Sequence, residues 1–159
     1  HLWEMAWQIA GFTEIMRKDW KDILADDKLV QANFSTTYPG VIRAWHRHNR
    51  GQVDYFIVLK GALKVCAYDE ATRELDEAVS TGLDLQVLRM PGHYWHGFKA
   101  ISDESAFLVY FATNLYDYKN PDEERRPWDD QKIVPKLING KKDDPRTGKP
   151  WDWNYPPHK

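Results

Sequence analysis

The feature that most constrains the fold is a series of short apolar segments, each ended by glycine, proline, asparagine or aspartate. We expect β-strands over Leu29–Thr37, Val41–His48, Tyr55–Leu59, Ala62–Tyr68, Leu75–Val79, Leu85–Met90, Gly97–Ile101 and Ala106–Thr113. The segments between them have turn chemistry, as in Tyr38-Pro39-Gly40 and Asn49-Arg50-Gly51. Ser102-Asp103-Glu104 is expected to turn the last two strands into a hairpin. Many short strands at regular spacing are typical of an antiparallel sandwich or barrel.

The two ends of the chain differ from this central block. From Thr13 to Leu24 the apolar residues follow roughly helical spacing, so a short N-terminal helix or strand is expected. Residues 1–138 are predicted to form one domain, because 159 residues fit a single core. Residues 139–159 are predicted to be an extended tail, rich in proline, whose Trp151, Trp153 and Tyr155 alternate and so pack along the barrel or a partner.

Composition excludes several classes of protein. Lys and Arg total 22 against 24 Asp and Glu, so no basic surface for nucleic acid or an anionic membrane is expected. No apolar run is long enough to span a membrane, and the first residues do not resemble a signal peptide. Cys66 is the single cysteine, which excludes a disulfide within the chain. We therefore expect a soluble protein in the cytoplasm.

Three histidines and one carboxylate are spaced in a way that points to a shared site. His46 and His48 lie two apart in an expected strand and therefore point to the same face. Asp54 follows across the turn at residues 49–51, where a hairpin would bring it beside them, and His96 follows Pro91 by five residues. This spacing resembles the two motifs of the cupin β-barrel. Metal cupins hold Fe, Mn, Ni or Zn with three histidines and a carboxylate, which suits imidazole and carboxylate ligands.

A longer resemblance is to the dTDP-4-dehydrorhamnose 3,5-epimerases, a cupin family. The segment 39–46, Pro-Gly-Val-Ile-Arg-Ala-Trp-His, is similar to that family's Gly-Val-Leu-Arg-Gly-Leu-His. Residues 91–98, ending His-Gly-Phe, resemble its Pro-x-Gly-x-x-His-Gly-Phe, and residues 108–113 resemble its Phe-Leu-Tyr-Lys-x-Thr strand. The acidic run 121–125 also matches. Together these motifs cover roughly residues 30–130.

The resemblance implies a jelly-roll cupin, without metal or other cofactor, that epimerises a nucleotide-linked 4-keto-6-deoxy sugar. It places His46 on the base that removes a proton next to the ketone and Tyr110 on the acid that returns one. It places Arg43 beside the base as a catalytic and binding residue. The other residues expected to bind substrate are His48, Gln52, His96 and Glu14. The resemblance also implies a homodimer.

The sequence departs from that family at Asp54, which stands where the epimerases have a lysine. We interpret Asp54 as a catalytic partner that accepts a ring proton from His46 or His48. Two alternatives stay open: a metal-dependent oxygenase, isomerase or lyase with His46, His48, Asp54 and His96 as ligands, and a non-catalytic sugar-binding cupin. Arg43, Arg47, Arg50 and Lys60 lie near the motif and are expected to attract the anionic nucleotide.

Overall fold

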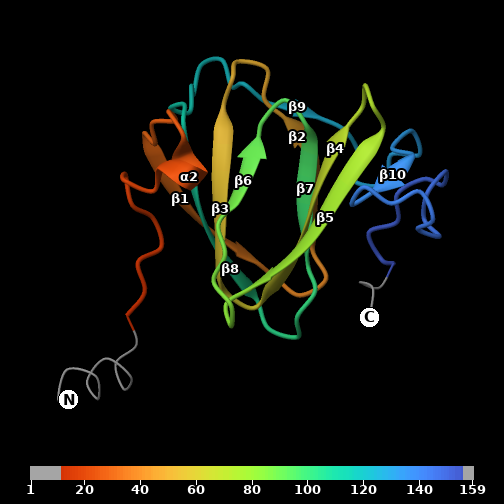
Figure 1. Ribbon diagram of the computed structural model, residues 1–159, viewed down its shortest axis with the longest axis horizontal. Helices are drawn as coiled ribbons and strands as arrows, with labels where there is room; N and C mark the ends of the chain where they lie inside the picture. Colours follow the sequence, from red (N-terminus) through yellow and green to blue (C-terminus); the bar gives the residue numbers. More distant parts are fainter. Residues whose placement is uncertain (1–11, 156–159) are drawn as a thin grey trace.

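The protein is an antiparallel jelly roll in which two sheets face each other (Figure 1). The computed structural model describes residues 12–155. Within them the strands are β1 Gln31–Thr37, β2 Ile42–Arg47, β3 Val53–Lys60, β4 Ala62–Asp69, β5 Glu74–Thr81, β6 Leu88–Pro91, β7 Trp95–Ala100, β8 Ala106–Ala112, β9 Glu124–Arg125 and β10 Leu137–Ile138. One sheet has the order β1-β8-β3-β6, and the other β10-β5-β4-β7-β2-β9. The expected all-β cupin fold is confirmed.

The turns that join the strands fall where the sequence places glycine. At Gly61, between β3 and β4, φ is +69°, a value that other residues adopt only with strain. A Cβ at this position would also lie 2.9 Å from the backbone oxygen of Ser105. Glycine therefore permits both the turn and the close approach of the chain before β8.

The expected hairpins at residues 48–54 and 101–106 are wrong, because consecutive strands there belong to different sheets. β2 pairs with β7 and β9, whereas β3 pairs with β6 and β8. β7 pairs with β2 and β4, whereas β8 pairs with β1 and β3. Phe98 of β7 and Leu108 of β8 are both buried in the core between the sheets. Facing sheets bury both inner surfaces, which two neighbouring strands of one sheet would not do.

The N-terminal helix is shorter than the spacing of residues 13–24 predicts. Only α2, Lys21–Leu24, is helical, and its N-cap residue Trp20 makes no side-chain capping bond. Short helices are unstable in water unless tertiary contacts hold them. Here Leu24 is buried, and the hydroxyl of Tyr55 in β3 contacts the carboxylate of Asp27. The segment therefore packs against the four-stranded sheet.

Two apolar clusters stabilise the barrel. The inner cluster fills the space between the sheets and contains Phe56, Val58, Leu63, Val65, Met90, Phe98, Ala100, Ala106 and Leu108. The outer cluster covers the other face of the six-stranded sheet and contains Trp45, Cys66, Tyr68, Leu75, Trp95, Ile133, Ile138, Trp151 and Trp153. Residues 142–155 run without helix or strand, yet Trp151 and Trp153 are buried. Among residues 12–155, no helix has the length and apolar character needed to cross a membrane.

Candidate active site

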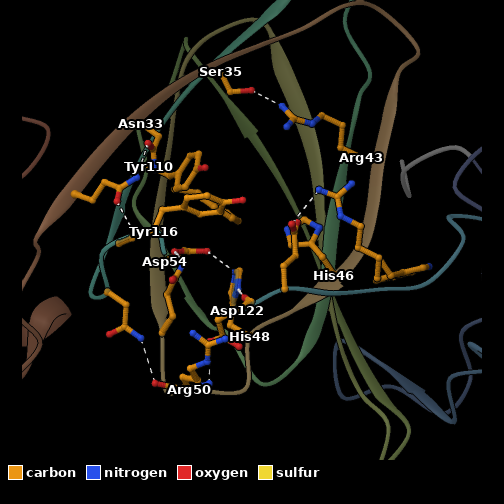
Figure 2. A pocket seen from close by; sticks show the side chains of 18 of the residues that line it. Asn33, Ser35, Arg43, His46, His48, Arg50, Asp54, Tyr110, Tyr116 and Asp122 are labelled. Carbon is orange, nitrogen blue, oxygen red and sulfur yellow. Dashed lines mark hydrogen bonds and ion pairs between the residues drawn. The ribbon is translucent and has the colours of Figure 1, made fainter. Parts of the chain in front are cut away.

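A cavity of about 580 Å³ opens between the two sheets and gathers most of the predicted site residues (Figure 2). β2 contributes Arg43 and His46, β3 contributes Asp54 and Phe56, and β8 contributes Tyr110. The residues that line the cavity and had been predicted as site residues are Arg43, His46, His48, Gln52, Asp54 and Tyr110. β2 of the six-stranded sheet thus faces β3 and β8, which are neighbours in the four-stranded sheet.

The rings of the three histidines lie close to one another. His46 of β2 is paired in register with His96 of β7, and the two ring centroids lie 4.2 Å apart. The ring of His48 lies 6.1 Å from that of His46 and 5.5 Å from that of His96. His46 and His48 line the cavity, whereas His96 is 0% exposed. The expectation that His96 contacts substrate stays a prediction, since His96 is fully buried and is not among the residues that line the cavity.

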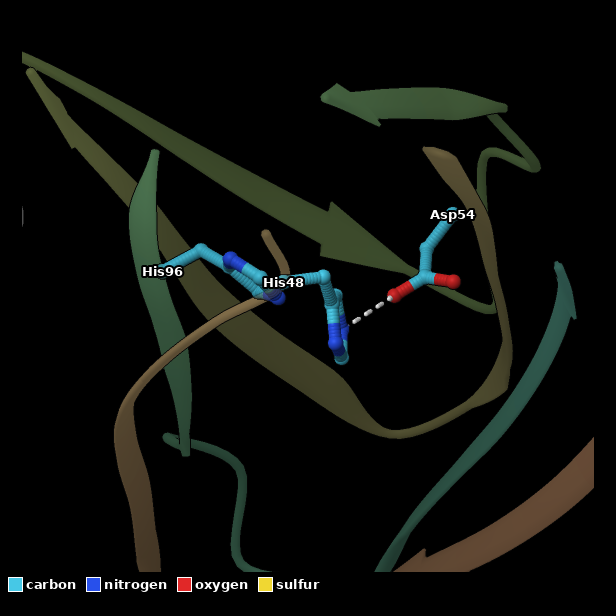
Figure 3. Close-up of side chains that lie close together, drawn as sticks. All are labelled: His48, Asp54 and His96. Atoms are coloured by element: carbon cyan, nitrogen blue, oxygen red, sulfur yellow. Dashed lines mark ion pairs between the residues drawn. The ribbon is translucent and has the colours of Figure 1, made fainter. Parts of the chain in front are cut away.

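Asp54 is held beside His48 in a buried position. One carboxylate oxygen, Oδ2, lies 3.4 Å from Nε2 of His48 (Figure 3). The other, Oδ1, accepts a hydrogen bond of 2.8 Å from the side-chain amide of Gln52. Asp54 is 3% exposed, so these two contacts supply the partners that a buried carboxylate requires. Asp54 was predicted to accept a ring proton from His46 or His48, and in the structure it lies beside His48.

Asp122 fixes the turn that carries His48. Its carboxylate accepts hydrogen bonds of 2.8 and 2.9 Å from the backbone N–H groups of Asn49 and Arg50. Its backbone oxygen lies 2.6 Å from Nδ1 of His48 and accepts that ring's second hydrogen bond. Asp122 therefore sets the orientation of the His48 ring from a segment 74 residues further along the chain.

Burial separates the protonation states of the histidines. Burial lowers the pKa of His46 to about 3, and positive charge on His48, Arg125 and Arg43 lowers this pKa in the same direction. Burial likewise lowers the pKa of His96 to about 3, with His46 as the next cause. Burial also favours the neutral ring of His48, but its contacts with Asp54 and Asp122 outweigh that effect and raise its pKa. His46 is thus an unprotonated ring beside a ring that retains its proton more readily.

Tyr110 and Arg43 occupy other parts of the cavity wall. Figure 2 shows Tyr110 on the side opposite His46, near Asn33. Burial raises the pKa of Tyr110, and the charge of Asp54 raises it further, so its hydroxyl keeps its proton. The guanidinium of Arg43 donates a hydrogen bond to the hydroxyl of Ser35 and stacks over Phe98 at 5.6 Å. No ion pair of Arg43 is present among the described residues, so its charge is available to a ligand.

The other predicted cationic residues are distributed differently. Arg50 lines the cavity. Arg47 and Lys60 do not line it: Arg47 pairs with Glu124 at 2.6 Å, and Lys60 pairs with Glu104 at 3.7 Å. The structure does not bring Glu14 to the cavity of its own chain, because Glu14 pairs with Arg17 on an exposed segment. The predicted binding roles of Arg47, Lys60 and Glu14 therefore have no support from the geometry.

Several lining residues were missed by sequence reasoning. Gln31, Asn33 and Ser35 of β1 project into the cavity at alternate positions. Their period of two could have revealed one polar face of a strand. Tyr116 and Tyr118 form an edge-to-face pair at 5.0 Å between centroids, and both line the cavity from the segment after β8. Nothing local in the sequence distinguishes that segment from an ordinary surface loop.

A cluster of possible metal ligands is smaller than the sequence suggested. Ligand atoms of His48, Asp54 and His96 all lie within 4.8 Å of one another. In the described part of the chain, His46 is not a member of this group. The chemistry of the set fits a divalent transition metal. Nδ1 of His96 bonds the backbone oxygen of Tyr94 at 2.8 Å, while its buried Nε2 has no hydrogen-bond partner.

The fold and the histidine-lined cavity between its sheets define a member of the cupin superfamily. Over residues 13–124 the chain matches, and belongs to, the family described as Polysaccharide biosynthesis C-terminal domain. It is 46% identical over 127 residues to the probable low-salt glycan biosynthesis epimerase Agl13 of Haloferax volcanii, covering 77% of this chain and 80% of that protein. The chain is thus an epimerase-like cupin, as the motifs of the sequence predicted.

Solved structures agree with this assignment. NovW, a 4-keto-6-deoxy sugar epimerase from the novobiocin biosynthetic gene cluster of Streptomyces spheroides, superposes with a TM-score of 0.66 at 25% identity, covering 88% of this chain and 69% of that chain. The capsular polysaccharide assembling protein CapF of Staphylococcus aureus superposes with a TM-score of 0.57 at 21% identity. This overlap covers 62% of this chain but 28% of CapF, so it shows the fold alone.

Proposed function

We propose that this protein epimerises a nucleotide-linked 4-keto-6-deoxy sugar by moving a proton on a carbon next to the ketone. The observation that carries the proposal is the position of His46 and Tyr110, which lie on different sheets and face one cavity. Inversion of a carbon requires a base on one face and an acid on the other. An unprotonated imidazole and a protonated phenol at opposite walls supply that pair.

His46 is suited to accept the proton. Its pKa of about 3 keeps the ring unprotonated at neutral pH. A base with so low a pKa is weak. Burial is the largest cause of the shift and the charge of His48 is the next, while the positive charges of Arg125 and Arg43 make smaller contributions. An anionic substrate that neutralises these charges raises the pKa of His46 and makes the ring a stronger base. Substrate binding therefore prepares the base.

The enolate that forms must be stabilised without the lysine of the resembling epimerases. Asp54 is paired with the ring of His48 and accepts a hydrogen bond from Gln52, so its charge opposes the enolate less than that of a free carboxylate would. Arg43 faces the same cavity without an ion pair among the described residues and can donate to the enolate oxygen. Tyr110 then returns a proton to the other face of the carbon.

The substrate class rests on the charges of the cavity and on the relatives. Arg43 and Arg50 offer guanidinium groups, which bind phosphate with paired hydrogen bonds. NovW is a 4-keto-6-deoxy sugar epimerase, and Agl13 is named a probable epimerase. Both relatives support epimerisation of a sugar by this protein. The test is to incubate the protein with dTDP-4-keto-6-deoxyglucose in deuterated water. Deuterium incorporation next to the ketone is expected, and its absence would contradict the proposal.

A second candidate is a metal-dependent cupin, and one observation favours it. The unpartnered Nε2 of His96 and the Nε2 of His48 both face the space that Asp54 borders. In each histidine the other ring nitrogen is held by a backbone oxygen, which is the usual arrangement of a metal-bound imidazole. A bound metal would polarise a carbonyl or an attacking water there. The three donors that would hold it are His48, Asp54 and His96.

A further inference from the structure

The strand that carries His46 is covered on its outer side by the end of the chain. We define the C-terminal strap as residues 139–155. Trp45, the neighbour of His46 in β2, is 1% exposed and contacts Trp153 of the strap, with 4.9 Å between ring centroids. Trp151 extends the contact at 6.2 Å from Trp153. The residue next to the proposed base is thus packed against a segment more than 100 positions away.

The strap is attached by buried charged groups as well as by hydrogen bonds between Asn139 and β5. Arg146 pairs with Glu77 of β5 at 2.5 Å and with Asp144 of the strap at 3.0 Å, and all three side chains are at most 7% exposed. Lys64 of β4 donates to the backbone oxygen of Tyr155 at 2.8 Å. Groups removed from water in this way are costly unless they remain paired. The strap therefore has one strongly preferred position on the six-stranded sheet.

The sequence of β2 fits this arrangement. The epimerase signature has leucine where this chain has Trp45. The match to the polysaccharide biosynthesis family covers residues 13–124, so Trp153 lies outside the matched region. A larger ring at position 45 projects further from the sheet and needs cover, which Trp153 supplies. Trp45, which differs from the signature, and Trp153 of the strap thus belong to one packing unit.

We infer that Trp153 is a positioning residue for His46, acting through Trp45. β2 is otherwise bordered by β7 and by the two-residue strand β9, and its pairing with β7 shifts register between Arg43 and His46. The ladder to β7 is therefore irregular near the base, although Trp45 exchanges backbone hydrogen bonds of 3.1 and 2.9 Å with Arg126 on the other edge of β2. The contact of Trp45 with Trp153 supports the strand from its outer face, in addition to these bonds. This inference rests on the proposed function only for its effect on the reaction, since the position of the His46 ring can be observed without substrate.

The experiment compares Trp153→Ala, Trp153→Phe and the control Trp128→Ala. Trp128 is 45% exposed and belongs to neither apolar cluster, so its loss removes an indole from outside the cluster that contains Trp45 and Trp153. Histidine ring resonances are assigned by NMR, and kcat and KM are measured by deuterium incorporation well below each melting temperature. Trp153→Ala should shift the His46 and His96 resonances and lower kcat on the order of 10- to 100-fold, as small displacements of a base do.

The remaining outcomes separate positioning from general damage. KM should change by less than about two-fold, because groups that bind the nucleotide are not on the strap. Trp153→Phe should recover most of kcat, and Trp128→Ala should match the wild type. Trp45→Leu should make Trp153→Ala less harmful. If Trp153→Ala does not fold, Trp153→Leu replaces it. A folded Trp153→Ala variant whose histidine resonances match those of the wild type would overturn the inference. If the wild type is inactive but the resonances shift in Trp153→Ala, only the proposed reaction would be contradicted.

Discussion

The ring of His46 lies against the ring of His96, with 4.2 Å between centroids, and only His46 reaches the cavity. The two residues are opposite each other on β2 and β7, so the ladder itself enforces their contact. Two imidazolium ions cannot be held at this distance in a buried place without a large cost. The pair therefore gives the cavity an unprotonated ring at its surface and a second unprotonated ring behind it.

This pair predicts a loss of stability in mild acid. The folded-state pKa values of His46 and His96 are about 3, below the unfolded value of about 6.5. The stabilisation from the neutral rings is thus complete above pH 6.5 and is lost as pH falls toward 3. Each site contributes at most about 1.4 kcal/mol of unfolding free energy per pH unit. The free energy of unfolding is measured with urea between pH 7 and 4. Its slope against pH should be shallower in His96→Gln than in the wild type. The exposed His93→Gln serves as the control, and an unchanged slope in His96→Gln would contradict this account.

Removal of the base should stop proton exchange. His46→Ala is expected to lower deuterium incorporation next to the ketone by at least about 100-fold, the usual contribution of a general base. Circular dichroism and the melting temperature should show that the fold remains, because His46 lies at the cavity surface. Substantial exchange in this variant would assign the base to another residue.

Removal of the acid should separate exchange from inversion. Tyr110→Phe keeps the aromatic contact with Phe56, whose ring centroid lies 5.8 Å away, but lacks the hydroxyl. The variant should still exchange deuterium through His46 while product epimer falls by about 100-fold. Product epimer is measured by NMR of the sugar, and equal loss of exchange and epimer would mean that Tyr110 does not act as a separate acid.

Nucleotide binding should depend on Arg43 and on salt. Calorimetry with dTDP is expected to show binding that weakens as ionic strength rises, because screening reduces attraction between exposed charges. Arg43→Gln should weaken binding about 10-fold or more, the range of a lost charged hydrogen bond. Lys60→Gln is the matched control, since its partner Glu104 lies outside the cavity. Equal affinity in all three proteins would exclude Arg43 from the nucleotide site.

The metal alternative has its own test. Protein purified without a histidine tag or added metal is analysed for Fe, Mn, Ni and Zn. If the epimerase proposal holds without a cofactor, metal should be far below one equivalent and activity should survive chelation. Near-stoichiometric metal that is lost in Asp54→Ala and His48→Ala, but kept in His93→Gln, would instead establish the three-donor site.

The strands were predictable because each one is a local pattern bounded by turn residues. Val53–Lys60 and Ala62–Asp69 flank a glycine that the sequence shows directly. Partner choice was not predictable, because a hairpin and a change of sheet use the same turn residues. The pairing of His46 with His96 is likewise set by non-local register.

The site was predictable where one motif carried it and unpredictable where distant segments met. His46, His48 and Asp54 lie within nine positions and share the cavity. Asp122 binds the turn at His48 from 74 positions away, so no local pattern shows its role. His96 lies on the expected motif and contacts His46, yet the sequence could not show that its side chain is fully buried and does not line the cavity.

The location of His46 on one sheet and Tyr110 on the other has a consequence for how this enzyme class diversifies. The span between the proposed base and the proposed acid depends on the separation of the sheets, between which Phe56, Phe98 and Leu108 of the inner cluster pack. A change of volume in that cluster alters the span without touching either group. New stereochemical outcomes can therefore arise during evolution from substitutions among hydrophobic residues, while every reactive side chain is inherited unchanged.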